Sequence, residues 1–281
     1  MSSKHRRRFL TVSCLVVTVG LLSSLPVPSG AQTIKIGGTG GAFGTMQVLA
    51  QAFKKSHPEA KVIAVPGLGS GGGRKALLGG AIDIAVTSKA GKDTEKLDGA
   101  IAMLLGKTPF VFATSKKNTT VALTTQELVD IWNGKKITWA DGSRLRLVLR
   151  PENDSDTEVL KRISAVMEQA VKNSLSREGM KIAVTDGEAA DAIEGIQGAL
   201  GTSSLSLIVS EKRSLKALEI NGVAPSPNTI ANGSYPYFKS LYVLTGTKPS
   251  GLTEEFIAFL SSTSGHKILT QLGYWMGEAG R

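Results

Sequence analysis

A glycine-rich stretch, residues 67–73, constrains the fold of this chain more than any other segment. It follows the apolar run 62–65, which has the composition of a buried strand, and it precedes residues 74–78, which begin a helical pattern. Glycine at such a turn allows positive φ angles and removes the Cβ atom that would block a ligand. The stretch therefore predicts a strand–turn–helix unit whose turn presents backbone N–H groups to an anion, with a flexible loop as the alternative.

A unit of the same kind precedes this one. Residues 33–38 predict a strand, 39–44 a second glycine-rich turn, and 45–56 a helix. Residues 81–86 predict a third strand, which leads into Ser88. Successive units of this kind predict an α/β fold with a mainly parallel, doubly wound sheet that binds ligands at the carboxyl ends of its strands.

The rest of the chain continues to alternate strands with helices. Strands are predicted at 109–114, 145–149, 182–184, 205–209, 215–220 and 241–244, and helices at 124–134, 158–171, 186–193, 253–260 and 265–272. These units form two groups, and we expect the chain to cross between them near 110–115 and to return near 221–226. Two crossings predict a hinge between two lobes with a cleft for a small ligand. The first lobe would comprise residues 32–110 and 226–281, and the second lobe residues 111–225.

The first residues have the pattern of a secretion signal. Residues 4–8 are basic, 9–25 are apolar, and 29–31 are small residues of the kind found at cleavage sites. We therefore expect residues 1–31 to be a signal peptide and the mature chain to begin at Gln32, in the periplasm. A membrane anchor is the alternative reading of the apolar run.

Charge and cysteine content narrow the class of protein further. The chain has 33 Lys and Arg against 23 Asp and Glu, a net charge of +10 that becomes +6 without the predicted signal. The remaining basic residues form no long run and few aromatics lie among them, so we expect a solvated surface and no nucleic-acid partner. Cys14 is the only cysteine, so the mature protein would contain no thiol, which suits an oxidising compartment.

No group of residues predicts catalysis. The three histidines, His5, His57 and His266, have no metal-ligand spacing. Residues 67–75 lack the Gly-Lys-Ser/Thr ending of a nucleotide phosphate loop. We therefore expect no enzyme activity, no metal and no cofactor. A secreted phosphoester hydrolase remains the alternative from another class, and a surface adhesion module a third.

The polar residues that remain favour a small anion. Thr39 begins one predicted helix, Ser70 a second, and Ser155 and Thr157 a third, so that backbone amides and hydroxyls could surround a desolvated oxyanion. Arg150 ends a strand just before the third helix and could add a bidentate charge, with a surface ion pair as its alternative role.

Asp83 is predicted to end the third strand beside these donors. A carboxylate next to an anion is unfavourable unless the ligand carries a proton for it to accept. Asp83 would then favour hydrogen phosphate over sulfate. The alternative is that Asp83 caps a turn through its own backbone.

The order of these motifs resembles the phosphate-binding subunit family of ABC transporters, which belong to the type 2 periplasmic binding proteins. Residues 67–73 followed by 81–86 are similar to that family's glycine–serine turn and the strand after it. Weaker similarities are found at 128–139, 150–157, 235–236 and 265–273.

The resemblance implies a monomeric two-lobed protein that closes on phosphate or a related oxyanion and delivers it to a membrane permease. Carried over position by position, it implies ligand contacts from Thr39, Gly40, Ala42, Phe43, Ser70, Asp83, Arg150, Ser155 and Thr157.

One segment departs from the family pattern. Asp156 stands where the family has glycine, and Glu152 and Asp154 add two further carboxylates to the same loop. Three acids beside a phosphate would weaken binding unless they point outward or are paired. Either the loop is placed differently, or the ligand is a phosphonate with an amine or another small organic solute, with loss of high-affinity binding as a further alternative.

Overall fold

The computed structural model describes residues 33–88 and 99–277. The predicted signal peptide, with Cys14 and the expected mature start at Gln32, lies outside these ranges. Among the described residues, no helix is both long and apolar enough to span a membrane.

The first half of the main sheet contains the three predicted parallel strands. They are β1 (Thr33–Gly38), β2 (Lys61–Val65) and β3 (Ile84–Thr87), and β1 lies between the other two. A late strand, β11 (Phe238–Gly246), pairs antiparallel with β3 and with β4 (Ala100–Ser115). The sheet is therefore mixed, because β11, which comes from a late part of the chain, runs antiparallel to both of its neighbours.

The long strand β4 belongs to both halves of the sheet. Its residues 100–109 pair with β11, whereas Phe110–Thr114 pair with β8 (Ala199–Ser204). The first predicted crossing between lobes therefore falls inside one continuous strand. Beyond β8 lie β6 (Arg146–Leu149) and β7 (Lys181–Ile182), both parallel to their neighbours. The remaining strands are β9 (Leu215–Ala217), which pairs with β4, and the small pair β5 (Ala122–Leu123) and β10 (Glu219–Ile220).

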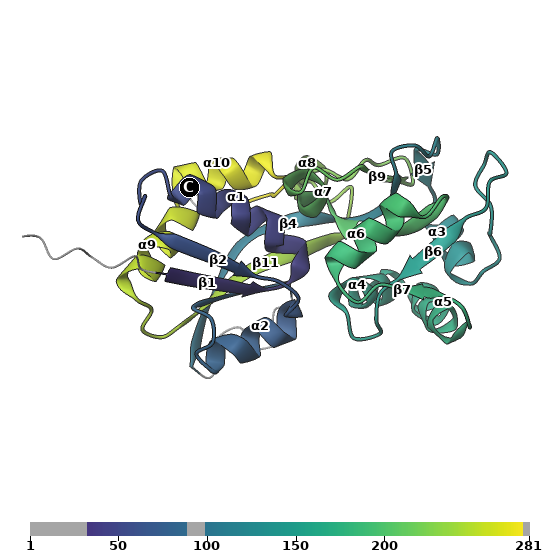
Figure 1. The fold of residues 1–281 in the computed structure, drawn as a ribbon. Coiled ribbons are helices and arrows are strands. Elements are labelled where there is room, and N and C mark those ends of the chain that lie inside the picture. The colour runs from purple at the N-terminus through teal and green to yellow at the C-terminus, as the bar shows by residue number, and fades with distance from the viewer. Residues whose placement is uncertain (1–32, 89–98, 278–281) are drawn as a thin grey trace, which may run out of the picture. The chain divides into compact units, whose positions relative to one another are not determined.

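Helices cover both faces of each half (Figure 1). In the first half, α1 (Phe43–Phe53), α9 (Gly251–Leu260) and α10 (Thr263–Gln271) pack on one face and α2 (Gly69–Leu78) on the other. In the second half, one face carries α3 (Thr125–Trp132), α4 (Ser155–Ile163), α5 (Ala165–Ser176) and α8 (Pro227–Ala231). The opposite face carries α6 (Asp186–Gly195) and α7 (Leu205–Ser210).

The alternation of side chains along β4 explains this double covering. Phe110 and Phe112 point into the core with α3, while Val111 and Ala113 point into the core with α6. All four side chains are buried, as expected for a strand with helices on both faces.

Two predicted elements are wrong. Residues 205–209 form helix α7 and not a strand, because Ser204 accepts a hydrogen bond from the backbone N–H of Leu207 and caps a helix. A short apolar run alone does not distinguish these two structures. The single helix predicted at 158–171 is two helices, since Ser164 has extended backbone angles between α4 and α5.

The packing of residues 230–235 bears on where the chain returns to the first half. Ile230 and Tyr235 lie in the core of the second half, where the Tyr235 hydroxyl donates to the Phe110 carbonyl oxygen at 2.9 Å. The lobe boundaries remain a prediction, and this packing favours placing residues 226–237 with the second half.

The glycine-rich stretch is part of a helix and a turn. Gly67 and Gly69 have φ angles of +77° and +63°, which the turn before α2 requires. Gly73 lies inside α2, and a Cβ atom there would lie 2.6 Å from the Cα of Gly38. The small size of Gly73 therefore lets the start of α2 pack directly on β1.

Candidate functional site

Five charged side chains meet where the two halves of the sheet join. Arg150 follows β6, Asp154 caps α4, Asp156 lies in the first turn of α4, Asp186 begins α6, and Lys239 is the second residue of β11. We call this group, Arg150, Asp154, Asp156, Asp186 and Lys239, the buried charge cluster.

Arg150 donates one hydrogen bond from each of its three side-chain nitrogens. Its side chain is 3% exposed, and its Nε and Nη2 donate to the two carboxylate oxygens of Asp154 at 3.3 and 2.8 Å. Its Nη1 donates to the carbonyl oxygen of Ala183 at 2.8 Å. Burial alone would lower the pKa of Arg150, but the carboxylates of Asp186, Asp154 and Asp156 outweigh burial and raise the pKa.

Lys239 and Asp156 form the most buried ion pair of the cluster. Their N–O distance is 2.5 Å, and their side chains are 5% and 1% exposed. The second oxygen of Asp156 accepts from the Thr202 hydroxyl at 2.8 Å. Burial is the largest single influence and raises the pKa of Asp156, but the charges of Lys239 and Arg150 and the hydrogen bonds from Lys239 and Thr202 together outweigh it and hold the pKa below its ordinary value. The same pairing raises the pKa of Lys239 despite burial.

Asp186 is held more loosely than the other two carboxylates. Its oxygens lie 3.8 Å from Arg150 Nη2 and 3.7 Å from Lys239 Nζ, beyond direct hydrogen-bond distance. Within the described part of the chain, no hydrogen bond to this carboxylate is found. Asp186 also lies close to Gly40: if Gly40 carried a Cβ atom, that atom would lie 2.8 Å from Asp186 Oδ2. Asp186 therefore occupies the space between two cations and the turn before α1.

The cluster contains three carboxylates and two cations. Burial, and next the charge of Asp156, raise the pKa of Asp154. With all groups ionised, the cluster has a formal charge of −1.

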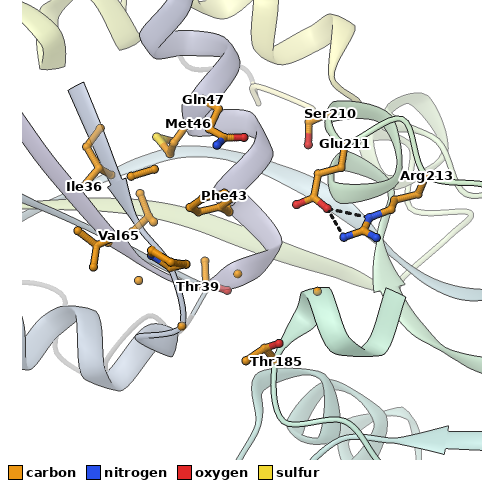
Figure 2. Close-up of a pocket in the computed structure, with 18 of the residues that line it drawn as sticks. Ile36, Thr39, Phe43, Met46, Gln47, Val65, Thr185, Ser210, Glu211 and Arg213 are labelled. Atoms are coloured by element: carbon orange, nitrogen blue, oxygen red, sulfur yellow. Dashed lines mark hydrogen bonds and ion pairs between the residues drawn. The ribbon is translucent and has the colours of Figure 1, made fainter. Parts of the chain in front are cut away.

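A cavity of about 780 Å³, which we call the main cavity, opens beside Gly40. Figure 2 shows Ile36, Phe43, Met46 and Val65 gathered on one side of it, and Ser210, Glu211 and Arg213 on the other. One wall is therefore apolar and the other is polar and charged.

Two further cavities lie on the other side of the cluster. One of about 570 Å³ is lined by Ser88, Ser155 and Lys239 among others. A small one of about 10 Å³ is lined by Thr39, Ala42, Ser88 and Lys239. Lys239, Ser88 and the glycine-rich turn at Thr39 therefore border the same small cavity.

Most of the residues predicted to bind a ligand lie around these cavities. Thr39, Gly40 and Phe43 line the main cavity, Ala42 the smallest and Ser155 the second. The hydroxyl of Ser70 lies 3.4 Å from the hydroxyl of Ser88. Whether any of these residues contacts a ligand stays a prediction.

Asp83 is not where it was predicted to be. It precedes β3 and so lies at the amino end of that strand, where its Oδ2 accepts from the backbone N–H of Lys35 at 2.7 Å. Ser88, which directly follows β3, occupies the carboxyl end. The prediction that Asp83 ends the strand was therefore wrong, because Asp83 lies at the opposite end of that strand.

Thr157 is also turned away from the cavities that border Lys239. It is buried, and its hydroxyl donates to the carbonyl oxygen of Arg150 at 3.3 Å. The neighbouring Asp156 enters the cluster instead, because Asp156 and Thr157 point in different directions from the first turn of α4.

The three acids of the loop at 152–156 are paired, which was one of the two arrangements expected for them. Glu152 points outward and contacts Lys161 at 3.2 Å, with its side chain 67% exposed. Asp154 and Asp156 contact the two buried cations. Sequence reasoning missed Lys239, a single lysine in an aromatic segment with no local signal, and it indicated only that Asp186 begins a helix. The cap of α6 is in fact Thr185.

The sequence matches the PBP superfamily domain over residues 25–264, and the chain belongs to that family. Its fold is the two-lobed α/β fold of the periplasmic binding proteins, with a mixed sheet in place of the mainly parallel one that was predicted.

Individual relatives agree with this assignment. The phosphate-binding protein PstS of Bacillus subtilis is 25% identical over 233 residues, which cover 80% of this chain and 74% of that protein. A Clostridium perfringens protein solved with bound phosphate has a TM-score of 0.73 at 22% identity, covering 86% of this chain and 98% of the other. An ABC-type phosphate transport receptor from Vibrio cholerae has a TM-score of 0.59 at 24% identity, covering 86% and 99%. At these identities the two solved structures show the shared fold.

Proposed function

We propose that this chain is an exported solute-binding protein that captures phosphate or a related oxyanion and passes it to the permease of an ABC importer. The Bacillus subtilis relative is named as a phosphate-binding protein, and the Vibrio cholerae structure as a phosphate transport receptor. The predicted signal peptide supports export to the periplasm. One observation carries the proposal, namely that the buried cations Arg150 and Lys239 lie on either side of one loosely held carboxylate, Asp186.

In this proposal the oxyanion takes the place of Asp186. The carboxylate lies within 4 Å of both cations and beside Gly40, which lines the main cavity. Since it has no close hydrogen bond to either cation, its displacement would break fewer contacts than displacement of Asp154 or Asp156. The incoming oxyanion would then receive charge-assisted hydrogen bonds from Arg150 or Lys239.

The ligand would be bound and released unchanged, by a single chain. Charge-assisted hydrogen bonds from two buried cations can hold an oxyanion without a nucleophile or a general base. Binding without reaction is the behaviour expected of a carrier that passes its solute to a membrane partner.

Calorimetric titration of the purified protein with inorganic phosphate, sulfate and organic phosphonates tests this function. We expect at least one of these oxyanions to bind at micromolar concentration or below, a free energy of about −8 kcal/mol or stronger. Failure of every oxyanion to bind would refute the proposal. Turnover of p-nitrophenyl phosphate that Arg150→Ala abolishes would favour a hydrolase instead.

A further inference from the structure

The polar wall of the main cavity carries as many negative as positive side chains. Arg213 is shared among three carboxylates, at 2.5 Å from Asp191, 2.7 Å from Glu211 and 3.6 Å from Glu194. Lys212 also lines the cavity and offsets one of these charges. The charged residues that line it, Glu194, Glu211, Lys212 and Arg213, sum to zero, so the net negative charge beside this cavity is the −1 of the buried charge cluster.

Glu211 has an oxygen available to a ligand. Arg213 Nε and Nη2 both contact the same oxygen, Oε2, at 2.8 and 2.7 Å. Figure 2 shows the other oxygen directed away from Arg213 into the hollow beside α1. The hydroxyl of Ser210, which lines the same cavity, is buried without a hydrogen-bond partner among the described residues.

The position of Glu211 is fixed by close packing on α1. A Cβ atom on Gly44 would lie 2.6 Å from Glu211 Cγ and 2.7 Å from Ser210 Oγ. Asp186 contacts the same turn at Gly40, four residues earlier. Four residues of 3-10 and α-helix span about 6 to 8 Å, so the cluster and the free oxygen of Glu211 lie within reach of one small molecule.

The apolar wall points to carbon in that molecule. Ile36, Phe43 and Val65 line the cavity beside the cluster (Figure 2). A bare oxyanion would leave these side chains exposed to water, whereas a short carbon chain would bury part of their surface.

On the basis of the proposed function, we propose that the ligand is a small organic zwitterion, in which a carbon segment joins an oxyanion to an ammonium group. The oxyanion lies at Arg150 and Lys239, the carbon segment lies on Phe43 and Val65, and the ammonium donates to Glu211 and Ser210. A bare dianion would add two negative charges to a cleft that is already negative, whereas a zwitterion brings a compensating positive charge.

Three probes separate the parts of this proposal: inorganic phosphate, ethylphosphonate, which adds the carbon segment, and 2-aminoethylphosphonate, which adds the ammonium. In calorimetric titrations we expect 2-aminoethylphosphonate to bind at least about 10-fold more tightly than ethylphosphonate, as one charge-assisted hydrogen bond would give. Ethylphosphonate should in turn bind more tightly than phosphate.

Glu211→Gln should remove most of the preference for 2-aminoethylphosphonate over ethylphosphonate. Its affinity for ethylphosphonate should stay within about 2-fold of the wild-type value, and this unchanged binding also shows that the variant is folded. Glu254→Gln is the matched control, because Glu254 is exposed on α9 and does not line the cavity. Equal affinities for the two phosphonates, or tightest binding of inorganic phosphate, would overturn this inference and leave the proposed function standing. Failure of all three probes to bind would overturn both.

Discussion

The ammonium of Lys239 and the carboxylate of Asp156 form a buried ion pair between the last strand of the sheet, β11, and the first turn of α4. The two residues are 83 positions apart in the sequence. Their pairing places the cation of Lys239, from a late strand, beside the loop at 152–156, in which the sequence alone shows only acidic side chains. The charge of the candidate site therefore depends on a contact that only folding creates.

Removal of Lys239 should destabilise the protein strongly. Lys239→Met leaves Asp156 buried without its main partner, and breaking a buried pair in this way costs about 3–5 kcal/mol. The double variant Lys239→Met/Asp156→Asn should recover part of this loss. Unfolding in urea measures both.

Lys172→Met is the matched control for this prediction. It breaks an exposed pair with Glu168, whose side chains are 50% and 44% exposed, and should cost less than about 1 kcal/mol. A loss of similar size in both lysine variants would show that the buried pair has no special role.

Arg150 and Asp83 should differ sharply in their effect on binding. Arg150→Ala should weaken the best-bound oxyanion at least ~10-fold, through loss of a charge-assisted hydrogen bond of ~1.5–3 kcal/mol. Asp83→Asn should change neither affinity nor the preference for phosphate over sulfate, since Asp83 lies at the opposite end of β3. Calorimetry with both anions measures this, and a change of selectivity in the Asp83 variant would contradict the structure.

Asp186→Asn should strengthen the binding of inorganic phosphate. The substitution removes the carboxylate that lies between Arg150 and Lys239 and brings the formal charge of the buried charge cluster from −1 to zero. We expect about a tenfold gain, equivalent to roughly 1.4 kcal/mol. Weaker binding in this variant would mean that Asp186 holds the ligand and is not displaced by it.

Two glycines of the same helix should respond in opposite ways to alanine. Gly73→Ala places a Cβ atom 2.6 Å from the Cα of Gly38 and should cost about 1–3 kcal/mol. At Gly71 nothing lies within 4 Å of such an atom, so Gly71→Ala should be neutral or stabilise α2 by up to about 1 kcal/mol. Thermal or urea unfolding of the two variants checks the packing of α2 on β1.

The pH dependence of stability should carry the signature of Asp156. Its pKa in the folded protein lies below the ordinary value of 3.8, so its contribution is present above that value and is lost as pH falls through the folded pKa. For Lys239 the folded pKa lies above 10.5, so its contribution is present below 10.5 and is lost only as pH rises through the folded pKa. The difference in unfolding free energy between wild type and Asp156→Asn should therefore narrow below about pH 4.

Much of the fold follows from local sequence patterns. The order of apolar runs and glycine turns predicts the three parallel strands and the helices α1 and α2, because each unit buries its own apolar face. The Thr124 and Glu127 capping box predicts the start of α3, and both of its hydrogen bonds are present. Such features are local, since the residues that decide them lie within a few positions of each other.

Two errors show where local patterns fail. The apolar run at 205–209 suits a strand or a helix equally, and the cap at Ser204 decides in favour of the helix. In the segment 81–88, Asp83 was assigned to the end of a strand that it in fact precedes, whereas Ser88 follows that strand. Strand ends are the least certain part of a sequence pattern, yet they determine which side chains reach a ligand.

The sequence by itself determined the class of fold, the turns that could meet an anion, and Arg150 as the cation beside them. Only the tertiary structure decided the charge of the site, because Lys239 and Asp186 arrive there from separate strands and helices. In a buried site, contacts within about 4 Å set the electrostatics, and such contacts between distant parts of the chain leave no periodic trace in the sequence.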